Sequence, residues 1–311
     1  MTIDARDALD RAIERLAEVG IESATHDAEA LLAHVVGVPR TVLHRHRILT
    51  TGQHTAYLDA ISRRERREPL QHILGSAAFR HLELLVGPGV FVPRPETEVL
   101  AGAAIEELHR LAAADPRAPR LAVDLCTGSG AVAIAMATEV PGTRVTAVEL
   151  SADAAAYARR NARGAQVDVR EGDIAKLADN ADLVGRVNVV TANPPYIPLA
   201  AYESVDIEAR AFDPAIALWS GEDGLDTIRL VCTVAAALLV DGGLVVCEHA
   251  DVQAESAPGV FAAAGWWTQV CDHVDLTGRP RFVTARRIPR RRDSRQQGWP
   301  TDPARAGTIA P

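Results

Sequence analysis

Apolar side chains near the start of the chain recur every three to four residues, which is the spacing of an amphipathic helix. The first predicted helix carries Leu9, Ile13 and Leu16 on one face and ends at Gly20. Apolar sets with the same spacing continue to about residue 67. The pattern therefore predicts a small bundle of helices.

The boundaries of the later helices are predicted from residues that cap or break a helix. Thr25 or Asp27 is the expected N-cap of the second helix, because a side-chain oxygen there can accept a hydrogen bond from a free backbone N–H. Pro69 is expected to end the helical region. We interpret the charged run at residues 63–68 as a solvated helix face, with contact to an acidic partner as the alternative.

Beyond Pro69 the pattern changes to short strands, and residues 77–86 predict a β-hairpin. Apolar runs typical of buried strands follow at residues 121–125, 144–148, 166–170, 187–190, 244–247, 266–270 and 281–285. Helices are predicted before or between them at residues 96–114, 130–139, 152–163, 225–239 and 252–263. This alternation predicts a mostly parallel sheet covered by helices on both faces. The last two strands have no helix between them and are expected to pair antiparallel at an edge.

We therefore expect an α/β protein with a Rossmann-like sheet, mostly parallel with an antiparallel edge, and a small N-terminal helical domain. The helical domain is expected at residues 1–75 and a β-hairpin linker at residues 76–95. The sheet domain is expected at residues 96–287. Residues 288–311 are polar and rich in Arg, Pro and Gly, so this tail is expected to be disordered.

Composition narrows the possible functions. The formal net charge of -8 and the pI near 5.7 argue against a general nucleic-acid binder, which would usually have a basic surface. No apolar run is long enough to span a bilayer, and no signal peptide is recognisable at the start. The four cysteines lie far apart, so we expect reduced thiols in apolar surroundings and no metal site. These features predict a cytoplasmic protein without a membrane or direct nucleic-acid partner.

The end of the apolar run at residues 187–190 is the first candidate site. It leads into Asn193, Pro194, Pro195 and Tyr196, and the prolines stop the strand at the sheet edge where α/β proteins bind ligands. The Asn193 side-chain oxygen and the Pro194 carbonyl can accept hydrogen bonds, and Tyr196 can add an aromatic face. Two such acceptors would favour the pyramidal nitrogen of a transition state over a planar –NH₂ group. A strand-ending turn without chemistry is the alternative.

The loop after the predicted strand at residues 121–125 is the second candidate site. It consists of Cys126, Thr127, Gly128, Ser129 and Gly130. Small residues let a ligand approach the backbone and the free N–H groups of the next helix. Glu149 follows the next strand at the position where an acid can bind both hydroxyls of a ribose. A ligand that contains a nucleoside is therefore expected.

Two further acidic residues indicate which kind of nucleoside would bind. Asp124 precedes the loop, where its carboxylate would attract a positive group and repel a pyrophosphate. Asp173 is placed to accept an adenine amino hydrogen, with an ordinary turn aspartate as the alternative. The Asp124 carboxylate and the acceptors of the segment from Asn193 to Tyr196 both fit S-adenosylmethionine, whose sulfonium and ammonium are positive. Residues 128–133 also satisfy the relaxed dinucleotide fingerprint, so a nicotinamide enzyme remains an alternative.

These motifs resemble those of class I S-adenosylmethionine-dependent methyltransferases. More narrowly, the chain is similar to the PrmC/HemK family of peptide chain release factor glutamine N5-methyltransferases over roughly residues 5–287. The stretches that support this narrower resemblance are residues 67–75, 91–98 and 212–218. Cys126 and Ser129 replace the commoner glycine and threonine, Glu149 replaces an aspartate, and Ile174 stands where an aromatic residue often stacks on adenine.

The resemblance implies methylation of the glutamine side-chain amide in the GGQ motif of class I release factors by a monomer, with residues 1–75 recognising the substrate. It implies a cofactor site at Asp124, Cys126, Thr127, Gly128, Ser129, Gly130, Glu149, Asp173, Ile174 and Asn193. The catalytic residues that it implies are Asn193, Pro194 and Tyr196. It implies a substrate pocket at Phe91, Pro93, Arg94, Thr97, Asn193, Pro194, Pro195 and Tyr196.

The residues themselves leave two other functions open. An adenine N6-methyltransferase shares the Asn193 to Tyr196 motif but would need a basic surface for nucleic acid. A nucleotide-binding module without catalytic activity would use the helical domain to contact a partner.

Overall fold

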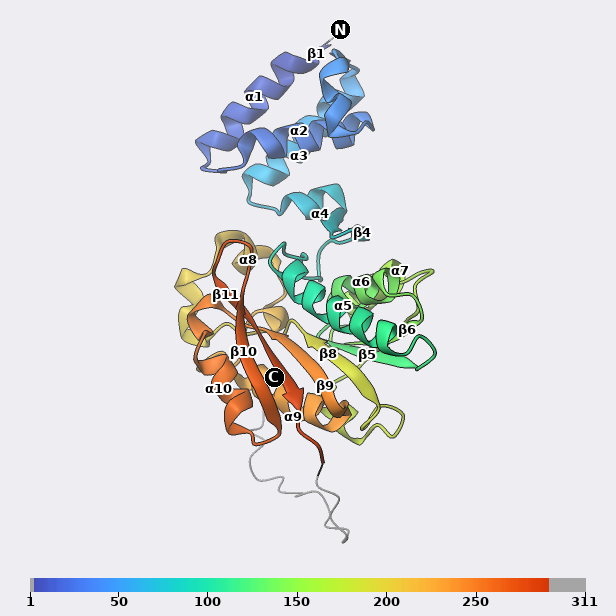
Figure 1. Ribbon diagram of the computed structural model, residues 1–311. Helices are drawn as coiled ribbons and strands as arrows, with labels where there is room; N and C mark the ends of the chain where they lie inside the picture. The colour runs from blue at the N-terminus through green and yellow to red at the C-terminus, as the bar shows by residue number, and fades with distance from the viewer. Residues whose placement is uncertain (1–2, 291–311) are drawn as a thin grey trace.

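The computed structural model describes residues 3–290, and its helical part lies apart from its sheet (Figure 1). The helical part consists of β1 (Ile3–Asp4), α1 (Ala5–Glu18), α2 (Ala24–Val36), η1 (Arg40–Arg45), β2 (Ile48–Leu49) and α3 (Thr51–Glu65). Its core includes the fully buried side chains of Leu16, Leu31, Tyr57 and Ile61. The predicted helical bundle is confirmed.

Two details of the bundle differ from the prediction. Ser23 precedes the first turn of α2, whereas Asp27 lies within the helix and its buried carboxylate accepts a hydrogen bond from Arg64 at 2.7 Å. Pro69 does not end the helical region, because α4 (Leu70–Leu74) begins directly after it. Proline is tolerated at the start of a helix, where its missing N–H needs no partner.

A short hairpin connects the helical part to the sheet, as the sequence predicted. It consists of β3 (Ser76–Phe79) and β4 (Leu82–Leu85), which pair antiparallel. Phe79 is fully buried in the core of the second part. Asn161, the last residue of α7 (Ala152–Asn161), exchanges two hydrogen bonds with the Leu85 backbone at 2.8 and 3.0 Å. The connector is therefore attached to the sheet domain.

Within the described residues the main sheet has seven strands, in the order β10-β11-β9-β8-β5-β6-β7. Their bounds are β5 (Arg120–Leu125), β6 (Thr143–Glu149), β7 (Val167–Glu171), β8 (Val187–Ala192), β9 (Leu239–Glu248), β10 (Trp267–Val274) and β11 (Pro280–Arg287). Strands β5 to β9 run parallel, and β11 is antiparallel to both β9 and β10. The predicted sheet with an antiparallel edge is confirmed.

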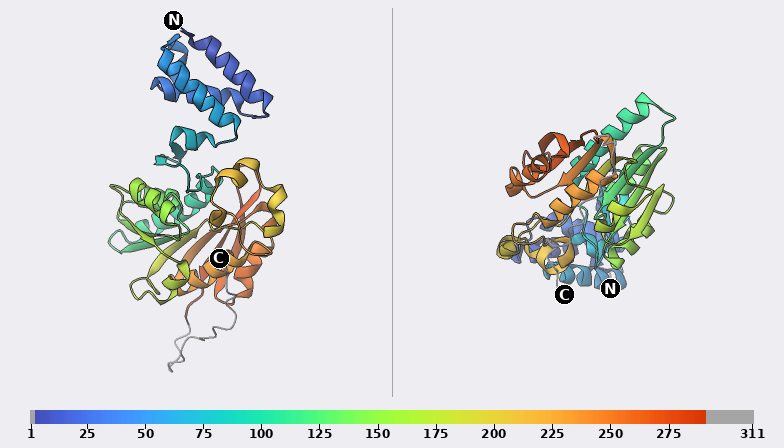
Figure 2. Two further views of the ribbon diagram at one scale, coloured as in Figure 1. Left: turned by 180° about the vertical axis from the view of Figure 1, so that it is seen from behind. Right: turned by 90° about the horizontal axis from the view of Figure 1, so that it is seen from below.

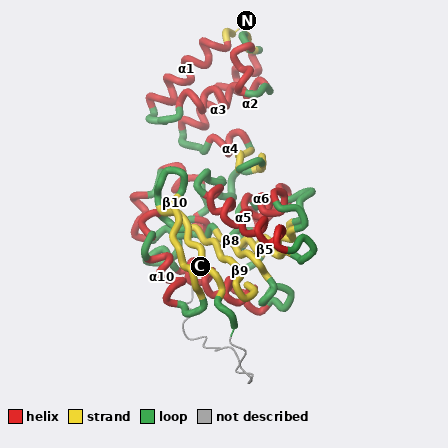
Figure 3. Tube along the Cα trace, in the orientation of Figure 1, coloured by secondary structure: helices red, strands yellow, loops and turns green. Residues whose placement is uncertain are grey.

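Alternate residues of the strands pack against helices on opposite faces. Val123 and Leu125 belong to the core beneath α9 (Asp226–Leu238) and α10 (Ser256–Ala263), whereas Ala122 belongs to the core beneath α5 (Thr97–Ala114) and α6 (Ala131–Glu139). Figures 2 and 3 show the sheet between its helices from several directions. This alternation follows from the side-chain period of a strand.

Three short elements between β8 and α9 were not predicted. They are η3 (Leu199–Ser204), α8 (Ile207–Phe212) and η4 (Ala215–Ala217), and η2 (Ile174–Asp179) was also missed. Across residues 3–290, no helix combines the length and apolar character needed to cross a membrane. The tail that is predicted to be disordered begins at residue 288. From residue 291 onward it lies outside the described part of the chain.

Candidate functional site

The site lies where the order of the parallel strands reverses. Strand β5 pairs with β6 on one side and β8 on the other, and Leu125 lies opposite Ala192 in the register. The loops that follow β5 and β8 therefore begin side by side. Open α/β sheets bind ligands at such a switch point, because neighbouring loops diverge there and leave a crevice.

A cavity of about 1180 Å³ opens at this edge. Nearly all the site residues named from the sequence line it: Phe91, Pro93, Arg94, Thr97, Asp124, Cys126, Thr127, Gly128, Ser129, Glu149, Asp173, Ile174, Asn193, Pro194, Pro195 and Tyr196. Gly130 is the exception. Its φ is 87°, and a Cβ there would lie 3.1 Å from the Ile134 side chain and 3.5 Å from Ala158. Its positive φ favours glycine at the turn into α6, so Gly130 contributes to the site only indirectly.

Glu149 holds the glycine loop from the end of β6. One carboxylate oxygen accepts a hydrogen bond from the Gly128 N–H at 2.8 Å, and the other accepts one from the Ser151 N–H at 2.9 Å. Each carboxylate oxygen has a second lone pair, so the group can still accept hydrogen bonds from a ligand in the cavity. The geometry is compatible with binding of both hydroxyls of a ribose.

Asp124 and Cys126 flank the start of the same loop. The Asp124 carboxylate is buried and accepts hydrogen bonds from the Thr127 and Thr191 hydroxyls at 2.5 and 2.6 Å. Burial raises its pKa to about 6. Asp124 thus joins the glycine loop to β8, and its carboxylate is engaged within the protein. Cys126 has a φ of 58°, a conformation that favours glycine. The cysteine side chain therefore strains the backbone at this position.

Asp173 and Ile174 form a further part of the wall, at the end of β7. Asp173 accepts a hydrogen bond from the Ala175 N–H at 2.9 Å and so caps η2. The Ile174 side chain is buried against the core beneath α9. Asp173 therefore has the role of a turn aspartate, and its position on the cavity also allows contact with a ligand.

The corner after β8 presents Asn193 to the cavity. Its side-chain Nδ2 donates a hydrogen bond to Thr97 Oγ1 at 3.1 Å. Thr97 is the first residue of α5 and is buried. The donor end of the Asn193 amide is thus used within the protein, and the acceptor end remains for a ligand. The acceptor role toward a ligand that the sequence predicts for the Asn193 oxygen stays a prediction, and this orientation is compatible with it.

Glu248 lies behind this corner, and sequence reasoning did not identify it. It ends β9 and accepts hydrogen bonds from the Thr97 hydroxyl at 2.8 Å and the Tyr196 hydroxyl at 3.3 Å. An acidic residue directly after an apolar strand at the sheet edge was a usable sign, because Glu149 was recognised by the same pattern. Burial, and next to it the charge of Glu248, raises the pKa of Tyr196, so its hydroxyl stays protonated.

The far wall comes from the loop before α5 and the segment after β8. Arg94 pairs with the buried Asp213 at 2.8 Å, and its guanidinium lies 5.0 Å from the Phe91 ring centre. Burial is the main cause of the raised pKa of Asp213. These contacts hold Phe91 and Arg94 in place beside the cavity.

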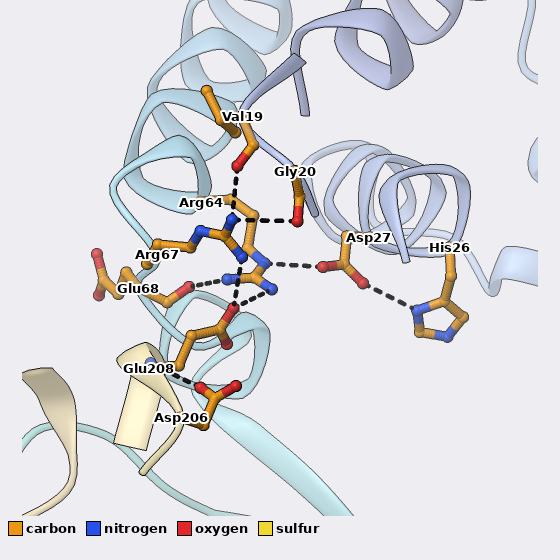
Figure 4. A network of polar contacts seen from close by, with 9 residues as sticks. All are labelled: Val19, Gly20, His26, Asp27, Arg64, Arg67, Glu68, Asp206 and Glu208. Carbon is orange, nitrogen blue, oxygen red and sulfur yellow. Dashed lines mark hydrogen bonds and ion pairs between the residues drawn. The ribbon is translucent and has the colours of Figure 1, made fainter. Parts of the chain in front are cut away.

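The helical part also contributes to the cavity wall. Arg64 on α3 is buried and binds Asp27 of α2 and Glu208 of α8, each at 2.7 Å (Figure 4). Arg67 approaches Glu208 at 3.9 Å and also binds the Val19 and Gly20 carbonyls. The prediction of a solvated face for residues 63–68 is therefore wrong for Arg64. Its acidic partners belong to the same chain.

No group of three or more His, Cys, Asp or Glu side chains in residues 3–290 is arranged to hold a metal ion. Cys271 is exposed, which corrects the expectation that every cysteine lies in apolar surroundings. The polar groups that line the cavity are backbone N–H groups, carboxylates and the amide of Asn193. This set fits a nucleoside with a positively charged group.

Two family models match parts of this chain. Residues 7–75 match the family model described as "PrmC N-terminal domain", and residues 122–213 match "Methyltransferase domain". A solved structure titled protein-(glutamine-N5) methyltransferase (release factor-specific), from Alicyclobacillus acidocaldarius, is 28% identical, with a TM-score of 0.41 over 66% of this chain and 99% of that chain.

The curated relatives match most of both chains. The "Release factor glutamine methyltransferase" of Streptomyces coelicolor is 51% identical over 277 residues, which cover 89% of this chain and 96% of that protein. The protein of the same name from Mycolicibacterium smegmatis is 43% identical over 286 residues, covering 92% and 98%. On these similarities, this chain belongs to the release factor glutamine methyltransferase family of S-adenosylmethionine-dependent methyltransferases.

Proposed function

We propose that this protein methylates the side-chain amide nitrogen of the GGQ glutamine of class I peptide chain release factors. The proposal is supported by the name of the relatives, "Release factor glutamine methyltransferase". The observation that carries it is the Asn193 amide, which donates to Thr97 and so keeps its oxygen for a substrate –NH₂ group. A nicotinamide enzyme or an adenine methyltransferase has no comparable support from the relatives.

The cofactor would be held by the glycine loop and by the ends of β6 and β7. Glu149 would accept hydrogen bonds from the ribose, and Asp173 and Ile174 would flank the adenine. Gly128 exposes backbone to the cavity. When bound, S-adenosylmethionine supplies a methyl carbon that is activated by a sulfonium and leaves without the bonding electrons.

The residues after β8 would bind and orient the glutamine. The Asn193 oxygen and the Pro194 carbonyl would accept hydrogen bonds from the amide –NH₂ and direct the nitrogen lone pair out of the amide plane. Tyr196 and Phe91 would cover the glutamine and exclude water. The proton that the nitrogen loses on methylation would pass to a nearby acceptor and from there to solvent. The main contribution of these residues to the rate would be to align the amide nitrogen with the methyl carbon, because this nitrogen is a weak nucleophile.

The helical domain would recognise the body of the release factor. Gly20, Ile21, Arg64 and Arg67 line the same cavity as Asn193, so a glutamine that reaches the site passes beside this domain. We therefore propose residues 1–75 as the substrate-recognition domain, residues 76–95 as the linker and residues 96–287 as the catalytic domain.

The direct test is incubation of the protein with S-adenosylmethionine and a purified class I release factor, followed by mass spectrometry of the peptide that contains GGQ. We expect one added methyl group on the glutamine and none when the substrate carries GGA. An unmodified GGQ peptide, in a preparation that binds S-adenosylmethionine, would refute the proposed substrate.

Asn193→Ala tests the role of the corner residue. We expect turnover to fall by about a hundredfold, because removal of one preorganised group at a reaction centre has an effect of this order. The free energy of unfolding, measured by urea denaturation, is the control for correct folding. Turnover equal to that of the wild type would exclude Asn193 from the mechanism.

A further inference from the structure

A continuous chain of hydrogen bonds connects the substrate corner to a buried carboxylate. Asn193 Nδ2 donates to Thr97 Oγ1 at 3.1 Å, and the Thr97 hydroxyl donates to Glu248 at 2.8 Å. Tyr196 donates to the other oxygen of Glu248 at 3.3 Å. Thr97 and Glu248 are only 4% and 2% exposed, so the bond between them is shielded from water.

The direction of each bond follows from the chemistry of its partners. An ionised carboxylate has no hydrogen, so Glu248 can only accept and the Thr97 hydroxyl hydrogen must point toward it. The Thr97 oxygen then presents a lone pair to Asn193. Only the –NH₂ end of the Asn193 amide can donate to that lone pair. The carbonyl end is therefore left for the substrate.

This direction matters because the two ends of an amide have nearly the same shape. A reversed Asn193 would present –NH₂ to the –NH₂ of the substrate glutamine, so two donors would face each other without an acceptor. Shape alone does not exclude the reversed orientation. The partner on the far side of Asn193 decides which end faces the cavity.

We propose that Thr97 and Glu248 are positioning residues that hold the Asn193 amide with its oxygen toward the glutamine, and that this requires Glu248 in its ionised form. The inference rests on the proposed function, since it concerns how that substrate is oriented. It also states a property of the ligand-free protein that can be measured without substrate.

The surroundings of Glu248 make its ionisation sensitive to pH. Burial raises its pKa to about 7, although hydrogen bonds from Thr97 and Tyr196 and the charge of Arg281 oppose the rise. The negative charge of Glu96 also raises the pKa of Glu248. Below this pKa a protonated Glu248 can donate to Thr97. The Thr97 hydroxyl is then free to donate to the Asn193 oxygen, which reverses the amide.

Nuclear magnetic resonance of the full-length, ligand-free protein tests the hydrogen-bond chain directly. The side-chain –NH₂ signals of Asn193 are assigned by their loss in Asn193→Ala. We expect them to shift with a midpoint near pH 7 in the wild type, to lose this titration in Glu248→Gln, and to move at all pH values in Thr97→Val. Signals that are independent of pH in the wild type, or unchanged by Thr97→Val, would overturn the proposal.

Kinetics with the release factor provide the second test. Thr97→Val keeps the shape of the side chain but removes the hydroxyl, and we expect kcat to fall about tenfold or more. Thr97→Ser should restore most of that loss. Glu248→Gln should remove the decline of kcat/KM on the acid side of pH 7. A Thr97→Val variant that binds S-adenosylmethionine and retains the wild-type kcat would refute the positioning role.

The two tests separate the inference from the proposed function. If the wild type does not methylate a release factor while the Asn193 signals titrate as expected, the proposed substrate is wrong and the orientation of Asn193 is supported. If the wild type is active but the signals do not titrate, the orienting role of Glu248 is wrong.

Discussion

At the scale of single residues, buried acidic side chains hold the loops that form the site. Glu149 binds two backbone N–H groups, Asp124 binds two threonine hydroxyls, and Glu248 binds the Thr97 and Tyr196 hydroxyls. Each lies at or next to the carboxyl end of a parallel strand. A carboxylate is suited to this position because it accepts several hydrogen bonds at once.

Glu149→Gln is a test of this role. A glutamine side chain has one acceptor oxygen in place of two, so it would lose the bond to either Gly128 or Ser151 and place an –NH₂ group against a backbone N–H. We expect the dissociation constant for S-adenosylmethionine, measured by calorimetry, to rise about tenfold or more.

Asp168→Asn is the matched control for Glu149→Gln. Asp168 is an exposed acidic residue on the neighbouring strand β7, outside the cavity wall. Its replacement should leave the dissociation constant within about twofold, because exposed ion pairs contribute little. Equal constants for the wild type and Glu149→Gln would mean that Glu149 neither orders the loop nor binds the cofactor.

At the scale of elements, the corner after β8 depends on a close approach of the loop before α9. Gly224 in that loop has a φ of 76°, and a Cβ there would overlap the Tyr196 carbonyl oxygen. It would also lie 2.8 Å from Gln253 Nε2, which donates to the same carbonyl. The position of Tyr196 therefore requires glycine at residue 224.

Gly224→Ala should shift the Tyr196 backbone and lower turnover about tenfold or more, because small displacements at a reaction centre are costly. It should also reduce the free energy of unfolding by about 1 to 3 kcal/mol, measured by urea denaturation. Gly242→Ala is the control, since Gly242 has a φ of 79° but no atom within 4 Å of an added Cβ. If both variants had the same turnover, the close approach would not matter for activity.

The strands and long helices could be predicted from sequence because their apolar periodicity is local. The four short elements η2, η3, α8 and η4 could not, because each has too few residues to show a period. The segment from η3 to η4 instead contacts distant parts of the chain, such as Arg94 through Asp213 and Arg64 through Glu208. Its structure depends on these partners more than on its own pattern.

At the scale of the whole molecule, Arg64 joins the helical part of the chain to α8, in the part that contains the sheet (Figure 4). Its side chain is 6% exposed, and the Asp27 side chain is 3% exposed. Glu208 on α8 is its partner on the catalytic side and is 26% exposed. Removal of the guanidinium would leave the buried Asp27 carboxylate without its Arg64 partner, and Glu208 would keep the more distant Arg67 at 3.9 Å.

Arg64→Met should therefore reduce the free energy of unfolding by about 3 kcal/mol, in the range found when one member of a buried ion pair is removed. Arg66→Met, a change at an exposed neighbour on the same segment, should alter it by less than about 0.5 kcal/mol. Urea denaturation followed by circular dichroism measures both. Similar values for the two variants would show that the Arg64 contacts contribute nothing measurable to stability.

Glu208→Gln addresses the contact between the domains alone, because it leaves the Arg64–Asp27 pair in place. Glu208 is partly exposed, so we expect a smaller loss of stability, under about 1 kcal/mol. If the contact sets the relative position of the two domains, KM for the release factor should rise while the affinity for S-adenosylmethionine is unchanged. An unaltered KM would argue against that role.

The sequence by itself determined the helical bundle, the parallel sheet with its antiparallel edge, the glycine loop and the proline-stopped strand. These features depend on residues close to one another in the chain, and their periodicity, glycines and prolines are visible there. The tertiary structure alone decided that Asp27 pairs with Arg64, that Glu248 lies behind Thr97, and which end of the Asn193 amide faces the cavity. Such contacts join residues far apart in the chain, and a side chain's partner is set by the packing of whole elements.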